Sequence, residues 1–267
     1  MSQSYMKDWE DLTICDDYMF KLVMRRKRIC RHMLERILQI KIRDIVYLDE
    51  EKTIDHSYGG KSIRLDVYVE DDANTVFDIE MQIKNPGTTA LTKRTRYYQA
   101  MMDLDMLKRG QPYDNLRASY IIFICPFDPF GKSRHIYTFH EWCDEDKTLE
   151  MGDETAKIFL NSLGTANDIP EDIKNFLNYI NGVLSDDPFV QELDDTIREL
   201  KEEEEEKVGY MTFKMKIEEK YQEGMKEGLE KGKISMIQSM LKNNLPIETI
   251  VAITGWNEDE IKKLALK

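Results

Sequence analysis

Two short stretches of the chain carry acidic residues at a spacing suited to metal chemistry. Residues 76–84 alternate between apolar and polar side chains, which is the period of a β-strand. Glu80 and Gln82 belong to the polar set, and Asp66 belongs to the polar face of the preceding stretch, 64–71. If the two strands pair, Asp66 and Glu80 meet on one polar face of a sheet.

Two carboxylates brought together in this way repel each other, and both resist ionisation in a dry site. A divalent cation relieves that repulsion, and oxygen ligands of this type suit Mg²⁺. The sequence therefore predicts a metal-dependent active site at Asp66 and Glu80, with Gln82 beside it. The alternative is a pair of surface strands whose acidic residues form salt bridges with Arg64 or Lys84.

The pattern around these residues predicts an α/β fold. A helix is expected from Asp16 or Asp17 to about Gln39, because apolar residues recur there at helical spacing. A second helix is expected over 88–109, and the wholly apolar run 119–125 is typical of a buried central strand. Further strands are expected over 42–48, 55–70 with a turn or bulge at Gly59-Gly60, 76–84, 134–140 and 156–160. This order of elements predicts a mixed sheet flanked by helices.

The C-terminal part of the sequence is helical and acidic. A first domain is predicted over 1–185, followed by a charged helical linker rich in Glu and Gly over 186–233. A small all-α unit, similar in pattern to a helix-turn-helix, is predicted over 234–267. Its exposed face carries several acidic residues, which favours packing or homo-oligomer formation over DNA reading.

Composition excludes some classes of protein and leaves others open. The 267 residues contain no apolar run long enough for a membrane span, and the first residues lack a secretory signal. The four cysteines are scattered, as expected for reduced thiols in a cytoplasm. A net charge of −13 argues against simple coating of nucleic acid. However, residues 21–43 and 82–102 are locally basic, which fits either a phosphate-backbone footprint or solvated helix faces.

Several segments together resemble a known family. The Asp66 and Glu80-Met-Gln82 arrangement is similar to the PD-(D/E)XK nuclease superfamily. More narrowly, the chain resembles the bacterial recombination-promoting nuclease / putative transposase family. The segments that carry this resemblance are 17–21 (DYMFK), 64–69 (RLDVYV), 78–82 (DIEMQ), 96–100 (RYYQA), 119–131 (SYIIFICPFDPFG), 135–139 (HIYTF) and 157–161 (KIFLN). The resemblance implies a restriction-endonuclease-like core and Mg²⁺-dependent cleavage of DNA. Mn²⁺ and Ca²⁺ are alternative ions, since they suit the same ligands.

The resemblance implies a role for each residue of the central motif. Asp66 and Glu80 hold the metal with help from the main-chain carbonyl of Met81, and the metal lowers the pKa of a bound water. Gln82 stands where the superfamily usually has a lysine. A glutamine orients a water through its amide but carries no charge. Lys84, two residues further on, is the predicted source of the missing charge.

Residues outside the motif receive supporting roles. Asp17 is either an outer metal or water ligand or a simple helix N-cap. Asp78 is expected to be an exposed strand residue. Tyr97 and Gln99 are predicted to support the site from the helix over 88–109, with ordinary helix packing as the alternative. The basic residues that open this helix are predicted to bind DNA phosphates or to brace the carboxylates; they are Lys93, Arg94 and Arg96.

Three functions follow from these observations. The first is a DNA endonuclease of bacterial cytoplasm, linked to recombination, mobile elements or defence. The second is a DNA-binding or assembly protein that keeps the nuclease fold without cleavage, which the glutamine at position 82 leaves open. The third is a transposase that joins DNA strands, but such chemistry usually needs a third acidic ligand, for which the sequence offers no clear candidate.

Overall fold

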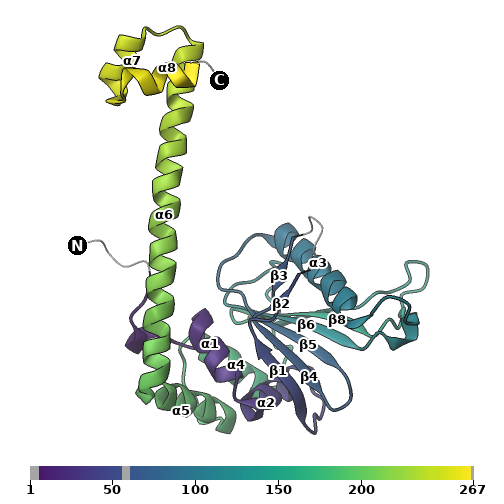
Figure 1. Ribbon diagram of the computed structural model, residues 1–267. Coiled ribbons are helices and arrows are strands. Elements are labelled where there is room, and N and C mark those ends of the chain that lie inside the picture. Colours follow the sequence, from purple (N-terminus) through teal and green to yellow (C-terminus); the bar gives the residue numbers. More distant parts are fainter. Residues whose placement is uncertain (1–5, 56–60, 266–267) are drawn as a thin grey trace. The chain divides into compact units, whose positions relative to one another are not determined.

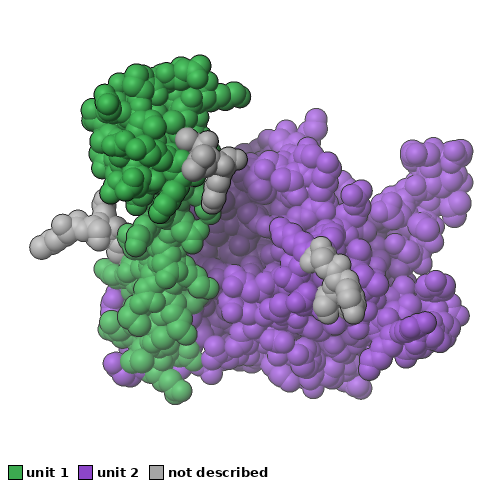
Figure 2. Space-filling model, turned by 45° about the horizontal axis from the view of Figure 1, so that its top comes forward, with its two compact units in different colours: residues 1–9, 205–267 green, residues 10–204 purple. Residues whose placement is uncertain are grey.

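The computed structural model describes residues 6–55 and 61–265. The chain divides into two compact units, one formed by residues 10–204 and the other by residues 1–9 with 205–267 (Figures 1 and 2). The larger unit contains all the strands of the described residues. The smaller unit is helical.

A six-stranded mixed sheet forms the centre of the larger unit. Its strands lie in the order β1-β4-β5-β6-β8-β7. The pairs β5–β6 and β6–β8 are parallel, and β1–β4, β4–β5 and β7–β8 are antiparallel. The strands are β1 (Ile45–Glu50), β4 (Val67–Asp71), β5 (Val76–Met81), β6 (Ser119–Cys125), β7 (Ile136–Phe139) and β8 (Thr155–Asn161). A separate two-stranded sheet joins β2 (Thr53–Ile54) to β3 (Ile63–Arg64). The predicted α/β fold with a mixed sheet is confirmed.

Helices cover both faces of the six-stranded sheet (Figure 1). Helix α3 (Thr88–Met106) lies on one face, where Leu91, Met102, Phe123 and Phe159 belong to one hydrophobic core. The helices α1 (Asp17–Met24), α2 (Lys27–Leu38), α4 (Glu171–Ile180) and α5 (Pro188–Glu202) gather on the other side. Polar residues of β4 and β5 that point toward α3 are therefore covered rather than exposed.

The first helix predicted from the sequence is two helices. The chain leaves the helical conformation at Arg26, whose backbone is extended, and resumes as α2. The residues from Met19 to Met24 are all buried, whereas α2 buries only one side. Because the two segments bury different faces, one straight helix cannot satisfy both.

Two predicted strand boundaries also differ from the structure. The region 55–70 contains two separate strands, β3 and β4, and the Gly59-Gly60 turn lies outside the described residues. The strand predicted over 76–84 ends at Met81. Its parallel neighbour β6 ends at Cys125, just before Pro126, so little of the ladder remains beyond the bond from Gln82 N to Ile124 O (2.9 Å).

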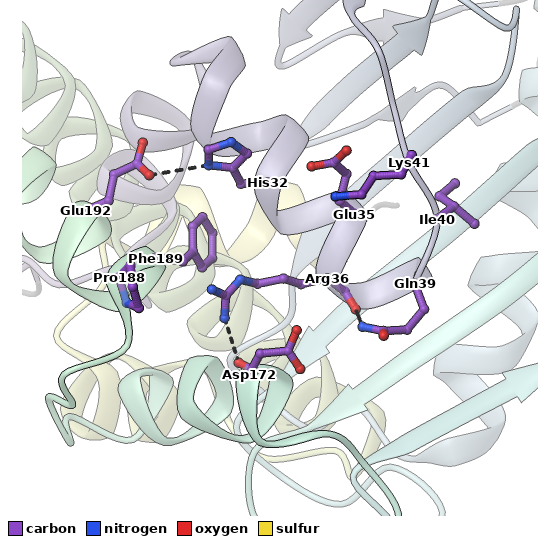
Figure 3. A pocket seen from close by; sticks show the side chains of 10 residues that line it. All are labelled: His32, Glu35, Arg36, Gln39, Ile40, Lys41, Asp172, Pro188, Phe189 and Glu192. Carbon is purple, nitrogen blue, oxygen red and sulfur yellow. Dashed lines mark hydrogen bonds and ion pairs between the residues drawn. The ribbon is translucent and has the colours of Figure 1, made fainter.

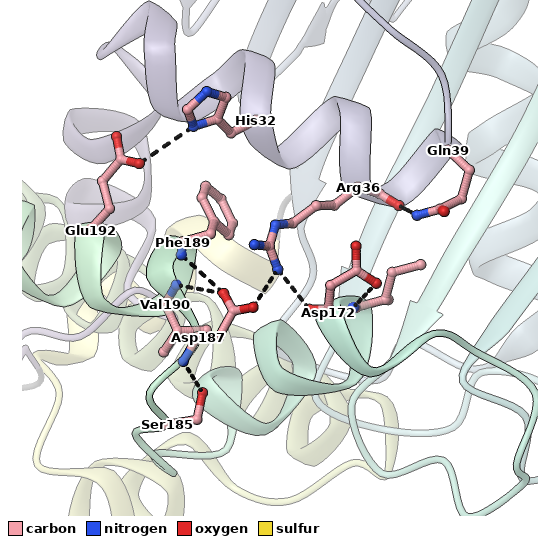
Figure 4. Close-up of polar contacts among 10 residues, drawn as sticks. His32, Arg36, Gln39, Asp172, Ser185, Asp187, Phe189, Val190 and Glu192 are labelled. Atoms are coloured by element: carbon pink, nitrogen blue, oxygen red, sulfur yellow. Dashed lines mark hydrogen bonds and ion pairs between the residues drawn. The ribbon is translucent and has the colours of Figure 1, made fainter.

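A pocket of about 530 Å³ lies between α2, α4 and α5. Figure 3 shows Phe189, from the start of α5, pointing toward the side of α2 that carries His32 and Arg36. The charged groups there are largely paired with one another: Arg36 bonds to Asp187, and His32 lies 3.4 Å from Glu192 (Figure 4). These contacts hold α2, α4 and α5 together, so the pocket has a structural role.

The C-terminal helices form the smaller unit. Helix α6 (Glu204–Lys242) has 39 residues and is followed by α7 (Ile247–Thr254) and α8 (Glu258–Ala265). Ile237, Ile250 and Ile261 make a small core where the three helices meet. The helical stretch predicted from Phe189 is thus interrupted at Glu203, between α5 and α6. The predicted domain boundaries at 185 and 233 stay a prediction.

Candidate active site

Asp66 and Glu80 lie side by side. Strands β4 and β5 pair with Val67 opposite Ile79, so Asp66, one residue before β4, faces Glu80. The amide of Asp66 donates to Oε1 of Glu80 (2.9 Å), and the amide of Met81 donates to Oδ2 of Asp66 (3.3 Å). The backbone therefore fixes both carboxylates. The alternative of surface strands is wrong, because Glu80 is only 5% exposed and Arg64 pairs with Glu51 instead.

Asp78 is the third carboxylate of this group. It was expected to be exposed, but its exposed fraction is 0% because α3 covers this face of the sheet. Among the described residues, no amide, hydroxyl or cationic group donates a hydrogen bond to Asp78. Its carboxyl group can share a proton with Glu80 when one of the two is protonated. The residue lies two positions before Glu80 on the same strand, so both side chains point to the same face.

The three carboxylates have pKa values above those of free Asp and Glu side chains. Burial and the neighbouring charge of Asp17 raise the pKa of Asp66 to about 6. Burial and the charge of Asp66 raise the pKa of Glu80 to about 8. The pKa of Asp78 is raised well above its usual value, first by burial and then by Glu80. Burial is the largest cause of each shift, so all three carboxylates resist ionisation in this site.

Arg94 supplies part of the positive charge from α3. Its guanidinium donates to Oε1 of Gln82 and lies 4.8 Å from the centre of the Phe123 ring. Its charge also lowers the pKa values of Glu80 and Asp78, against the effect of burial. Arg94 thus lies close to the carboxylates and bonds to Gln82, and its two predicted roles stay predictions.

Lys21 is the second cation at the site, and sequence reasoning did not assign it a role. Its Nζ lies 2.9 Å from Asp17, 2.7 Å from Glu51 and 3.6 Å from Asp66. Although burial alone would lower the pKa of Lys21, hydrogen bonds to Glu51 and Asp17 raise it above the ordinary value. The available signal was a lysine inside an apolar helical run, which is rarely buried unless paired.

Asp17 lies on the Lys21 side of the site. The N-cap position of α1 belongs to Asp16, so the N-cap interpretation of Asp17 is wrong. The side chain of Asp17 accepts a hydrogen bond from Lys21 instead (3.0 Å). Its charge contributes to the raised pKa of Asp66, which places it close to the carboxylates.

The other predicted supporting residues lie in different places. The amide of Gln82 donates to the main-chain carbonyl of Lys84, whose side chain is exposed. The hydroxyl of Tyr97 donates to the carbonyl of Lys61 (2.6 Å), and Gln99 donates to Ser119 Oγ (2.7 Å). The structure therefore does not bring Tyr97 or Gln99 to the carboxylates.

Tyr98 is the tyrosine of α3 that faces the acidic group. Burial raises its pKa, and the charge of Glu80 raises it further. Its ring centre lies 5.6 Å from the Arg94 guanidinium. Because successive residues of a helix are turned by about 100° from one another, Tyr97 and Tyr98 point in different directions. The prediction from the sequence named Tyr97, whereas the tyrosine whose pKa responds to Glu80 is Tyr98.

A scan against models of protein families supports one assignment. The model described as PD-(D/E)XK nuclease family transposase matches residues 14–231, which is most of the chain. The chain belongs to this family. Searches of the curated proteins and of the solved structures found no match. Family membership confirms the resemblance read from the motif segments and supports nuclease activity at the level of the family.

The acidic group fits the divalent metal ions that PD-(D/E)XK nucleases generally use. Two buried carboxylates and one that is partly buried lie together with raised pKa values, and no cationic or neutral donor among the described residues hydrogen-bonds to the buried oxygens of Asp78. Among residues 6–55 and 61–265, no group of three or more His, Cys, Asp or Glu side chains is arranged to hold a metal alone. Mg²⁺ commonly takes one or two carboxylates and completes its shell with water and phosphate oxygens. Asp66 and Glu80 are sufficient for that mode.

The helices of this family member give one further finding. None of those formed by the described residues is both long and apolar enough to cross a membrane.

Proposed function

We propose that the protein is a metal-dependent DNA endonuclease that hydrolyses phosphodiester bonds. The observation that carries the proposal is a group of three carboxylates, Asp66 before β4 and Asp78 and Glu80 on β5, whose burial raises their pKa values. A divalent ion bound to these carboxylates would offset their negative charge. Membership of the PD-(D/E)XK nuclease family transposases supports the same chemistry.

The residues of the site have separate tasks in this proposal. Asp66 and Glu80 would hold Mg²⁺, together with the main-chain carbonyl of Met81; Mn²⁺ and Ca²⁺ suit the same oxygen ligands. The ion, when bound, polarises a phosphoryl oxygen and lowers the pKa of a bound water. Gln82 positions the attacking water through Oε1, which accepts from Arg94 and retains a second lone pair.

Exposed basic residues of α3 would hold the DNA. Lys93 and Arg96 are exposed on the same helix that carries Arg94. Contacts of this kind to phosphates fix the position of DNA without reading its sequence. We therefore assign Lys93 and Arg96 to DNA binding, and Arg94 to the support of Gln82.

The test is cleavage of supercoiled plasmid by the full-length protein. We expect nicking that requires Mg²⁺, stops with EDTA and falls at least about 100-fold in Glu80→Ala, since the metal would lose a ligand. Glu145→Ala, at an exposed position, is the matched control and should cleave like the wild type. Equal cleavage by Glu80→Ala would show that the site lies elsewhere. An inactive wild type across Mg²⁺, Mn²⁺ and Ca²⁺ would favour a non-catalytic DNA-binding or assembly protein.

That second function has one observation in its favour. Gln82 replaces the usual lysine of the superfamily, so the central motif carries less positive charge. Retention of DNA binding without cleavage would support it. A role in recombination, mobile-element movement or defence, and a place in the bacterial cytoplasm, belong to the nuclease proposal and depend on its outcome.

We also propose that the protein forms a homo-oligomer through its C-terminal helical region. Helix α6 exposes several large apolar side chains along its length, including Met211, Met215, Met225 and Leu229. These residues follow three- and four-residue spacings in part, as in helices that pair with a second helix.

A further inference from the structure

The ammonium group of Lys21 lies among carboxylates from three separate parts of the chain. Asp17 comes from α1, Glu51 follows β1, and Asp66 precedes β4. Their oxygens lie 2.9, 2.7 and 3.6 Å from the same nitrogen. An ammonium has three donors and no acceptor, so it can bond to several carboxylates at once. The space between these three carboxylates is therefore occupied by a cation that belongs to the protein.

The position is built by the backbone as well as by the side chains. Glu51 has a φ of 72°, a left-handed conformation that is unfavourable for a residue with a side chain. Its amide donates to the carbonyl of Asp66 (3.1 Å), which ties the turn after β1 to the start of β4. The Glu51 carboxylate is thereby held next to Asp66, although the two residues are distant in sequence.

Asp66 lies between this position and Glu80. Its Oδ1 faces Lys21, and its Oδ2 accepts the amide of Met81, next to Glu80 in β5. A carboxylate shared in this way is how an acidic residue bridges two neighbouring cations in a two-metal site, where the ions lie about 4 Å apart. Here the ammonium of Lys21, a residue that is only 5% exposed, occupies one of the two positions that cations would take.

We propose that Lys21 takes the place of a second divalent ion, so that the site binds one metal ion, at Asp66 and Glu80. The inference rests on the nuclease function proposed above and adds the number of ions and the identity of the second positive charge. Lys21 acts by its charge toward the substrate phosphate and transfers no proton. It supplies the charge that Gln82 lacks, which had been predicted to come from Lys84.

The experiment counts Mn²⁺ ions bound to the full-length protein, by calorimetry with electron paramagnetic resonance as a second readout. Sites at the carboxylates are those lost when Asp66→Asn and Glu80→Gln are combined. We expect one such ion in the wild type and two in Lys21→Met, because Asp17, Glu51 and Asp66 would then lack their cation. Lys21→Arg should keep one ion.

The matched control is Lys231→Met. Lys231 also pairs with an acidic residue four positions away, Glu227, but this pair is exposed on α6. Its loss should leave one ion bound. Circular dichroism of each variant establishes that it is folded, and the wild-type count tests the proposal even if Lys21→Met does not fold.

The outcomes separate this inference from the function on which it rests. Two ions in the wild type would overturn the inference and leave the metal-dependent nuclease standing. One ion of unchanged affinity in a folded Lys21→Met would also overturn it. No ion lost on removal of Asp66 and Glu80 would instead reject the metal site of the proposed function.

Discussion

At the residue scale, the chemistry of the site depends on the balance between its carboxylates and the cations that lie near them. Asp66, Asp78 and Glu80 lie on one face of the sheet, and the charges of Lys21, Arg64 and Arg94 offset theirs. Burial makes each ionised carboxylate costly, so protons compete with a metal for the same oxygens. The stability of the protein should therefore depend on both pH and metal.

We predict that the metal-free protein becomes less stable as the pH rises from 5 to 8.5. The folded-state pKa of Glu80 is about 8, above its value in an unfolded chain, so its contribution is complete at low pH and is lost as the pH rises through 8. Asp66, with a pKa of about 6, acts in the same direction. Thermal unfolding in EDTA measures this dependence.

Glu80→Gln should weaken that pH dependence, because it removes one of the groups that titrates. At pH 8.5 in EDTA the variant should be more stable than the wild type by about 1–3 kcal/mol. Mg²⁺ should stabilise the wild type more at pH 8.5 than at pH 6 and should have little effect on the variant. Stability that rises with pH in EDTA would contradict the proposed state of these carboxylates.

At the scale of the elements, Arg36 and Asp187 are central to the contacts between α2, α4 and α5. Arg36, on α2, donates to Oδ2 of Asp187 and to the carbonyl of Asp172, both at 3.0 Å (Figure 4). Asp187 also caps α5 by accepting from the amides of Phe189 and Val190. The carboxylate of Asp187 therefore both caps α5 and binds Arg36 of α2.

We predict that Asp187→Ala destabilises the protein by about 2–4 kcal/mol. The loss of the cap costs about 1 kcal/mol, and the partly buried Arg36 would lose its charged partner. The stability of Asp187→Asn should lie between those of the wild type and Asp187→Ala, because its amide oxygen still caps the helix. Urea unfolding measures these differences, with the exposed neighbour variant Asp186→Ala as the control. A variant Asp187→Ala as stable as Asp186→Ala would show that this junction contributes little.

At the scale of the whole molecule, the two compact units differ in how they are stabilised. The larger unit has a sheet covered on both faces, whereas α6 buries only Tyr210 and Ile237 among its described residues. Tyr210 packs on Trp9 and donates to the carbonyl of Lys7 (2.7 Å). Several large apolar side chains of this long helix are exposed, which agrees with the proposed pairing of copies.

We predict that Met225→Glu combined with Leu229→Glu shifts the full-length protein toward the monomer. The two charges would be buried against a second copy, which costs several kcal/mol without partners. Size-exclusion chromatography with light scattering measures the mass. The control combines Lys226→Gln with Lys233→Gln, which changes the net charge equally and keeps the apolar residues. A wild type that is monomeric, or an unchanged mass of the first variant, would reject oligomerisation through α6.

The sequence by itself determined the strands and the pairing of the two central acids. The alternation over 76–84 and the apolar run over 119–125 located β5 and β6, since a strand turns successive side chains to opposite faces. Asp66 and Glu80 could be matched because they flank a short connection. Strand ends, such as Gln82, and the division of 55–70 into β3 and β4 were misjudged, because neighbouring strands decide where a ladder starts and stops.

Only the tertiary structure decided what surrounds these acids. Asp78 became buried because α3 packs over a face that is polar by local pattern, and the rotation of α3 brought Tyr98 rather than Tyr97 to the site. Lys21 reached Asp66 because α1 separates from α2 and turns its side chain toward β4. Periodicity reports which side of an element is apolar, but the contacts between distant elements depend on how their faces pack together.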